Sequence, residues 1–416
     1  MAIIAQPIDP ADTALSAPAT ANPVTGWRRW TELFILLGGG MITTLAFTSV
    51  VPGLPKIAEH FKGADSIFSA QFVLVMAPAG MALAGLFAGA VVRALGVRTA
   101  VFLGLAITTL AGTCQLWVDS LMGLQAARFV LGASLITTDV ALATIIGARF
   151  VGPARARIMG FRQAIGSVGT VCTMLLSGVL IQAGSWRTPG MLFLLPALFL
   201  MLAVVTFNRP LVLVDARRDD PSRALERFSV LNLWPIYLLA FLMTVCHAMP
   251  SFQMPFLLKE MHVTDSRLVS LVPSLSAFIG ILTALVFGLI YARIGRMTFV
   301  LASVAMGLGF IGMGLAPGFG VILGFVVLEG IGAGMTQPYF ASRVLDRITV
   351  AQRSQAMGFM LSAVFLGHVA NPFVIKPIRD AFGMHNAFII MGGFLVAAAA
   401  VLSVRALFTR GKATIV

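Results

Sequence analysis

Apolar residues in this chain occur in blocks of about twenty, separated by short polar or Gly/Pro-rich breaks. A helix of that length crosses the hydrocarbon core of a bilayer, roughly 30 Å thick, and satisfies its own backbone hydrogen bonds in lipid. The composition agrees, because 58% of the residues are hydrophobic and only 11% are charged, whereas a soluble domain is about a quarter charged. We therefore predict an all-α membrane protein.

Twelve such blocks lie between charged breaks, so we predict twelve transmembrane helices. Their approximate ranges are 31–51, 67–90, 100–118, 122–147, 159–183, 190–208, 231–253, 267–291, 298–316, 320–342, 356–378 and 386–408. The first six spans form an N-terminal bundle and the last six a C-terminal bundle. The predicted organisation is a mobile cytoplasmic tail at 1–30, bundles at 31–208 and 231–408, a cytoplasmic connection at 209–230 and a cytoplasmic tail at 409–416.

Basic residues set the orientation of the predicted spans. Of the 29 Lys and Arg residues, 20 fall on the side of the N-terminus and seven on the other side, while Arg128 and Arg162 lie within spans. The positive-inside rule then places both termini in the cytoplasm. The net charge of +13 follows from this topology, and a nucleic-acid partner is not expected, because such binding needs basic residues clustered on one face. We expect a multi-pass monomer in the lipid bilayer of the cell (inner) membrane.

Motifs for enzymatic chemistry or for cofactors are absent from the sequence. Cys114, Cys172 and Cys246 stand singly in apolar spans, without the spacing of a metal site. The glycines at 38–40 and 330–334 are not followed by the Lys-Ser/Thr of a nucleotide-binding loop. We predict no metal, no cofactor and no enzyme; a membrane-embedded transferase would need acid and base residues converging at one membrane face.

The two predicted bundles repeat one another at an offset near 200 residues. The matches are Asp65-Ser66 with Asp265-Ser266, Gly89 and Gly96 with Gly288 and Gly295, Gly132 with Gly330, and Met159-Gly160-Phe161 with Met357-Gly358-Phe359. Because six spans are repeated, the two bundles keep the same orientation and are related by a pseudo-two-fold axis along the membrane normal. Such repeats rock about a central site in alternating access.

With these residues in view, the sequence resembles the major facilitator superfamily from the first span to the twelfth. The loop signature of that family has Gly, an acidic residue, a basic residue, Gly and further basic residues. Its counterparts here are Gly89, Arg93, Gly96 and Arg98, and in the second half Gly288, Arg293, Gly295 and Arg296. Arg93 occupies the acidic slot, so we expect Asp139 to be its partner; the alternative is that Asp139 reaches interfacial water.

Further signatures of the family lie in spans four, five and eleven. The resemblance links Arg128, four residues before Gly132, to proton coupling or substrate binding, whereas a purely structural hydrogen bond is the alternative. Arg128 and Asp139 project from nearly one helix face, about 16 Å apart along the axis. The antiporter signature of span five is degraded to Ser177-Gly178, while span eleven keeps Asn371-Pro372.

Ionisable and polar residues inside the spans are the candidate site residues. The proton-coupling candidates are Glu329, Asp139, His247 and His368. The substrate-cavity candidates are Arg128, Gln253, Gln337, Tyr339 and Asn371. Glu329 is the leading proton site, because a carboxylate deep in a span is costly unless it is protonated or paired. The alternatives are a structural hydrogen bond for Glu329 and plain packing for the histidines.

The resemblance implies a secondary active transporter whose partners are protons and a small organic solute. The leading hypothesis is proton-coupled efflux of small amphipathic organic compounds by alternating access. Uptake of a small organic metabolite is the alternative, and a non-transporting receptor or assembly factor on the same scaffold is a remote one.

Overall fold

The structure is a computed structural model, and it describes residues 26–61, 65–150, 152–207, 233–348 and 353–410. Twelve helices in these ranges are long and apolar enough to cross a membrane, and no strand occurs among the residues described. The predicted all-α fold with twelve transmembrane helices is therefore confirmed. The predicted connection at 209–230 lies outside the described residues, as do most of the two predicted tails.

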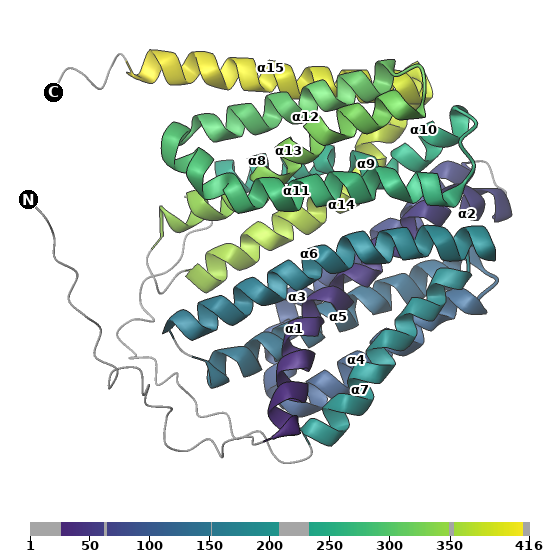
Figure 1. Cartoon of the computed structure of the whole chain (residues 1–416), viewed down its shortest axis with the longest axis vertical. Coiled ribbons are helices and arrows are strands. Elements are labelled where there is room, and N and C mark those ends of the chain that lie inside the picture. Colours follow the sequence, from purple (N-terminus) through teal and green to yellow (C-terminus); the bar gives the residue numbers. More distant parts are fainter. Residues whose placement is uncertain (1–25, 62–64, 151, 208–232, 349–352, 411–416) are drawn as a thin grey trace, which may run out of the picture.

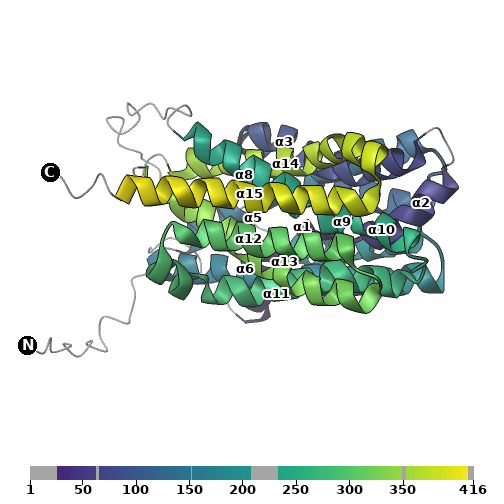
Figure 2. The same ribbon diagram turned by 90° about the horizontal axis from the view of Figure 1, so that it is seen from above.

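Each half of the chain contributes six spans. The N-terminal half contains α1 (Trp27–Thr48), η2 (Val51–Gly53), α2 (Leu54–His60), α3 (Ser66–Leu95), α4 (Val97–Thr113), η3 (Cys114–Leu116), α5 (Leu121–Arg149), α6 (Gly152–Ala183), η4 (Thr188–Phe193) and α7 (Leu194–Thr206). The C-terminal half contains α8 (Trp234–His247), α9 (Met249–Phe252), α10 (Met254–Glu260), α11 (Ser266–Ile294), α12 (Met297–Leu315), α13 (Phe319–Leu345), α14 (Arg353–Phe382) and α15 (Met384–Arg410). Figure 1 shows the two halves one above the other, and Figure 2 shows that α11, α12, α13 and α15 run nearly parallel.

Two differences from the predicted spans have local causes. The first span begins at Trp27, so part of the predicted tail is helical. Spans one and seven are each broken into short consecutive helices, α1–η2–α2 and α8–α9–α10. Prolines stand at the first positions of the short pieces, at Pro52, Pro55, Pro250 and Pro255. Proline lacks a backbone N–H and clashes with the preceding turn, so a helix breaks before it.

The sequence repeat is visible in equivalent helix ends. Asp65 caps α3 by accepting a hydrogen bond from the Phe68 amide at 3.0 Å, and Asp265 caps α11 by accepting one from the Arg267 amide at 2.8 Å. Gly96 and Gly295 end the same two helices with φ of 79° and 54°. Only glycine adopts this region without strain, so the second glycine of the loop signature ends the helix in both halves.

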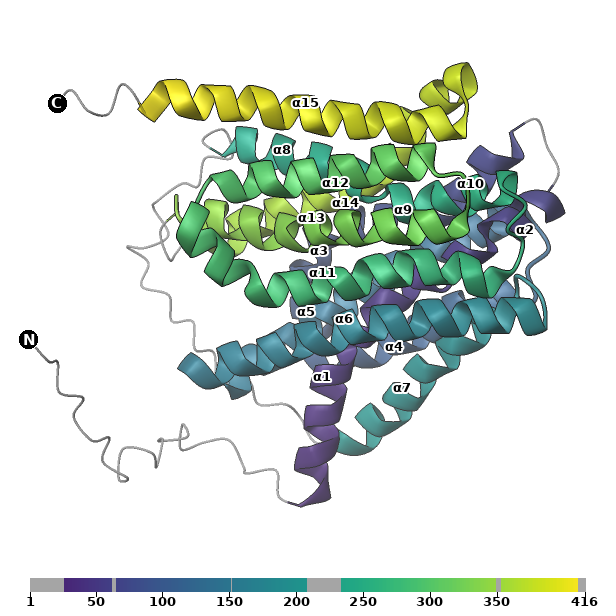
Figure 3. The ribbon, with the colours of Figure 1, turned by 45° about the horizontal axis from the view of Figure 1, so that its top comes forward.

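The two halves meet mainly through two helix pairs, α6 with α11 and α14 with α3, and also where α10 meets α2 and α11 meets η2. Figure 3 shows α6 and α11 lying side by side between the halves. Lys376 of α14 forms an ion pair with Asp65, and Lys259 of α10 forms one with Glu59 of α2 at 2.8 Å. We call the end of the molecule that carries these contacts the closed end. Among the described residues, the ion pairs that join the two halves all lie there.

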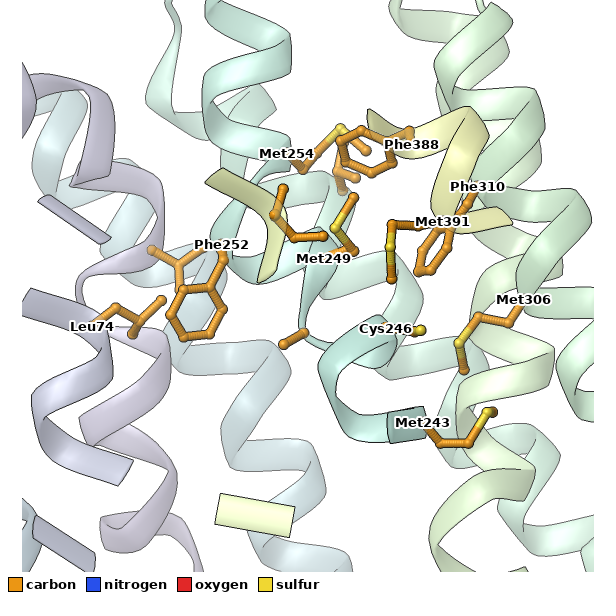
Figure 4. Packing of buried hydrophobic residues seen from close by; sticks show 14 of the residues in the cluster. Leu74, Met243, Cys246, Met249, Phe252, Met254, Met306, Phe310, Phe388 and Met391 are labelled. Atoms are coloured by element: carbon orange, nitrogen blue, oxygen red, sulfur yellow. The ribbon is translucent and has the colours of Figure 1, made fainter. Parts of the chain in front are cut away.

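Methionine and phenylalanine side chains fill the core of the C-terminal half near the closed end. Figure 4 shows Met254 beside Phe388 and Met391 beside Phe310, with Met249 between them and Met306 and Met243 lower in the view. Methionine fills irregular gaps because its side chain is long and unbranched. These residues are buried in packing, so they stabilise the bundle and do not line an open cavity.

Candidate functional site

Glu329 lies at the centre of the C-terminal half, on α13, and its side chain is fully buried. Ser276 of α11 donates a hydrogen bond to Glu329 Oε2 at 2.5 Å. His247, the last residue of α8, places Nδ1 3.8 Å from Glu329 Oε1. Glycine at 309 on α12 allows this arrangement, because a Cβ there would lie 2.9 Å from the Cβ of Glu329. Helices α8, α11 and α12 therefore enclose the carboxylate that α13 carries, and one of them places a titratable ring beside it.

The two histidines connect this carboxylate to the space between the halves. The side chain of His247 is 43% exposed although Glu329 is completely buried, so the ring separates the carboxylate from the exposed space. His368 lies where α14 packs against α8, because a Cβ at the preceding Gly367 would lie 2.7 Å from the Cβ of Thr244, three residues before His247. The ring of His368 is 5.6 Å from the ring of Phe47 on α1, which belongs to the other half. Three of the four proton-coupling candidates therefore lie together.

Asp139, the fourth candidate, lies in the N-terminal half, and its partner differs from the predicted one. Arg162 of α6 donates to Asp139 Oδ1 at 2.5 Å, and Thr43 of α1 donates to the same oxygen at 3.3 Å. Arg93 is exposed at the end of α3. Asp139 precedes the end of α5 by ten residues, which is about 15 Å. Arg162 is therefore the cation within reach, and none of the sequence motifs pointed to it.

Arg128 is buried on α5, and other residues of the N-terminal half hold it. Its guanidinium donates to the Ala46 carbonyl at 3.0 Å, to Ser49 Oγ at 3.3 Å and to Gln115 Oε1 at 2.8 Å. The guanidinium carbon Cζ of Arg128 lies 5.7 Å from the centre of the Phe193 ring. The partners of Arg128 are thus all neutral and lie in its own half, and no described hydrogen bond or ion pair joins Arg128 to Glu329.

Gln253 and Asn371 belong to a fully buried row of amide side chains at the closed end. Gln71 of α3 donates to Gln253 Oε1 at 2.7 Å, Gln253 donates to Asn371 Oδ1 at 3.0 Å, and Asn371 donates to the Val245 carbonyl at 2.7 Å. Gln71 comes from the N-terminal half and the other residues from the C-terminal half. This row therefore joins the two halves, and it must break if the closed end opens.

Gln337 and Tyr339, also on α13, lie elsewhere. Gln337 is exposed. Tyr339 is buried in an aromatic cluster, with its ring 6.2 Å from Tyr291 and 5.4 Å from Phe299. Tyr339 is therefore a packing residue in this conformation.

The remaining residues of the loop signature flank the two glycine turns. Arg93, Arg293 and Arg296 are exposed, and Arg98 places its guanidinium 5.3 Å from the Phe102 ring. A Cβ at Gly288 would meet nothing within 4 Å, and one at Gly89 would meet only the side chain of Arg93. These two glycines therefore face open space, on the opposite side of the molecule from the closed end.

Comparison with known proteins places this geometry in a family. The sequence matches the model of the Major Facilitator Superfamily over residues 36–372. Over 150 residues it is 24% identical to the multi-drug resistance efflux pump PmrA of Streptococcus pneumoniae, a match that covers 35% of this chain. The chain spans 37% of the length of that relative.

Solved structures share the fold across most of the chain. A D-xylose–proton symporter has a TM-score of 0.71 at 15% identity, with 89% of this chain and 96% of that chain covered. The nucleoside transporter NupG has a TM-score of 0.69 at 14% identity, with 90% and 98% covered. The inward-open xylose transporter XylE from E. coli has a TM-score of 0.67 at 14% identity, with 89% and 95% covered.

Proposed function

We propose a proton-coupled mechanism for this chain, which belongs to the major facilitator superfamily of secondary transporters. It is a multi-pass membrane protein rather than an enzyme. In the proposed mechanism, it exports small amphipathic organic compounds and takes up protons in exchange. The observation that carries the proposal is the buried carboxylate of Glu329 beside His247.

The contacts between the halves support alternating access. The Asp65–Lys376 and Glu59–Lys259 ion pairs and the row of buried amides hold one end shut. Under the topology expected from the basic residues, this is the external end. The described conformation is then open to the cytoplasm, and the opposite conformation requires these contacts to break.

Glu329 is suited to carry the proton, because it is buried beside a titratable ring that is itself partly exposed. A buried carboxylate without a cation favours its neutral form, and a neighbouring cation favours the charged form. In this conformation, the His247 ring lies on the exposed side of the carboxylate, and Ser276 donates a hydrogen bond to its other oxygen. Phe47 touches His368 across the halves, so closure at the cytoplasmic end changes the water around the histidines.

Flux measurements in proteoliposomes test this proposal. Glu329→Gln should abolish solute accumulation driven by a pH gradient and retain solute exchange, because the amide keeps the shape and cannot titrate. Glu260→Gln, at the exposed end of α10, is the matched control and should keep full accumulation. Unchanged gradient-driven accumulation by Glu329→Gln would remove Glu329 from the mechanism, and the absence of any solute flux in the unaltered protein would favour a receptor or assembly factor.

Uptake by proton symport is the second candidate function. It is favoured by the fold neighbour described as a D-xylose–proton symporter, whereas the relative described as an efflux pump favours export. A deletion strain separates the two. Increased sensitivity to amphipathic compounds is the expected result for export, and a new nutrient requirement without that sensitivity would identify uptake.

A further inference from the structure

An ion pair lies deep in the N-terminal half, away from Glu329. It joins Arg162 of α6 to Asp139 of α5, with Thr43 of α1 hydrogen-bonded to the same carboxylate oxygen. All three residues lie within membrane-spanning helices. Charged groups at such depth are expensive and usually serve a solute or ion pathway. The proton mechanism proposed above does not use this pair.

The contact between Arg162 and Asp139 leaves most of the guanidinium unused. A guanidinium offers five N–H donors and binds a carboxylate best through two parallel hydrogen bonds. Here, one nitrogen of Arg162 meets one oxygen of Asp139 at 2.5 Å. Arg162 Nε is buried and has no hydrogen-bond partner. The arginine therefore has unused capacity for an oxyanion.

A glycine on α1 makes room for the guanidinium. A Cβ at Gly39 would lie 3.2 Å from Arg162 Nη2 and 3.5 Å from Nε. A Cβ at Gly40 would lie 2.5 Å from the Arg162 carbonyl oxygen. The close approach of α1 to α6 thus fixes the arginine, while the acid is held less tightly. The Arg162 side chain is only 7% exposed, whereas Asp139 is 33% exposed.

The Asp139 carboxylate keeps an exposed edge although it joins α5 to α1 and α6. Asp139 is bonded to α1 and α6, so its side chain does not lie on a free outer face of α5. A carboxylate turned toward lipid at this depth would be costly. Arg128, about 16 Å away along α5, is bound only by neutral oxygen atoms. Helices α5 and α6 therefore bury two arginines against one acid, and this excess of positive charge within the N-terminal half favours an anionic solute.

We propose that Arg162 binds the carboxylate group of the transported solute and that Asp139 is the resident anion that the solute replaces. The solute class is an amphipathic monocarboxylate, whose planar headgroup fits the fork of the guanidinium. Thr43 keeps its hydrogen bond to Asp139 when the Asp139 carboxylate leaves Arg162 to the solute. This inference rests on the proposed transport function, because it names the substrate class of that same transporter.

Binding to the purified full-length protein tests the inference without any proton gradient. The probes are 4-phenylbutyrate, octanoate and dodecanoate, each compared with its neutral amide. The carboxylates should bind the unaltered protein and the amides should not. Asp139→Asn should lower the Kd of the carboxylates by about fivefold or more, since removing a competing ligand relieves a coupling of typical size. A purely structural ion pair predicts the opposite, a weaker binder.

Variants of the arginine provide the second half of the test. Arg162→Gln should abolish carboxylate binding, and Arg162→Lys should weaken it because lysine lacks the fork; the lysine variant decides the matter if the glutamine variant does not fold. Arg157→Gln removes the same charge from an exposed position of α6 and is the matched control. Equal binding of acids and amides, weaker binding by Asp139→Asn, or no binding of any of the three carboxylates would overturn the inference.

The binding assay and the flux assay can give opposite outcomes, so the solute class and the proton site can be refuted separately. Proton-driven flux that depends on Glu329, together with no carboxylate binding at Arg162, would refute only the solute class. Carboxylate binding that depends on Arg162, together with flux that ignores Glu329, would refute only the proton site.

Discussion

The crossing of α6 and α11 at the closed end depends on Gly178, so a larger residue there tests whether this contact holds the end shut. A Cβ at Gly178 would lie 2.6 Å from the Ser266 carbonyl oxygen and 2.7 Å from the Cβ of Ser270, and closer still to Ser270 Oγ. Backbone atoms of α11 cannot move aside singly. A larger side chain at 178 must therefore push the two helices apart.

The expected size of the effect follows from the cost of overpacking. Adding a side chain to a filled interface costs about 1–3 kcal/mol, which changes a conformational equilibrium by roughly 5- to 150-fold. Gly178→Leu should therefore shift the protein towards the conformation in which this end is open. Gly160→Leu on the same helix is the matched control, because a Cβ at Gly160 would meet nothing within 4 Å.

Spin-label distances across the closed end measure this shift. Labels are placed at Ala183→Cys and Thr264→Cys, both exposed, after replacing the exposed Cys172 by Ser. The unaltered glycine and the Gly160→Leu control should give a short distance, and Gly178→Leu should give a predominantly longer one. A Gly178→Leu protein with the same short distance would refute the argument that this crossing requires a glycine.

Three further predictions concern charge, hydrogen bonding and the backbone. Burial acts to raise the pKa of Asp65, but hydrogen bonds from Lys376 and the Phe68 amide, with Arg379 nearby, hold this pKa below its ordinary value. The Asp65 carboxylate should therefore stabilise the closed end above about pH 4, and this stabilisation should be lost as the pH falls through the lowered pKa. Spin-label distances should show this transition in the unaltered protein and lack it in Asp65→Asn. Arg128→Lys should lower the free energy of unfolding by about 1–3 kcal/mol, measured by thermal melting, because the single nitrogen of lysine replaces two separate nitrogens, Nη1 bonded to Ala46 and Nη2 bonded to Ser49 and Gln115; an unchanged melting temperature would contradict the hydrogen-bond assignment. Gly96→Ala should cost about 1–2 kcal/mol, because Gly96 has φ of 79°, whereas Gly89→Ala, in helical backbone, should be neutral or slightly stabilising.

The spans and the repeat were predictable because lipid imposes a simple length and polarity rule on the chain. Asp65 and Asp265 matched in the sequence and cap equivalent helices in the structure. The breaks in spans one and seven had a signal in Pro55 and Pro255 that the block pattern alone concealed, since the flanking residues are apolar.

The pairing of charged residues was the part that sequence could not supply. Arg93 was chosen for Asp139 from its slot in the loop signature, yet Arg162 lies beside it. Depth along a span follows from residue number, but the direction of a side chain depends on how the helices pack. The grouping of Glu329 with His247 likewise needed the structure, because the two residues lie on different helices of unknown rotation.

The sign of net solute flux under opposite pH gradients shows whether this protein couples transport to protons. In proteoliposomes loaded with solute on both sides, a pH gradient of equal size imposed in the two directions should drive net solute movement of equal size and opposite sign. Glu329→Gln should show no net movement in either direction while isotope exchange continues. Net movement that ignores the gradient in the unaltered protein, or a full reversal retained by Glu329→Gln, would contradict the proposal that Glu329 couples transport to protons.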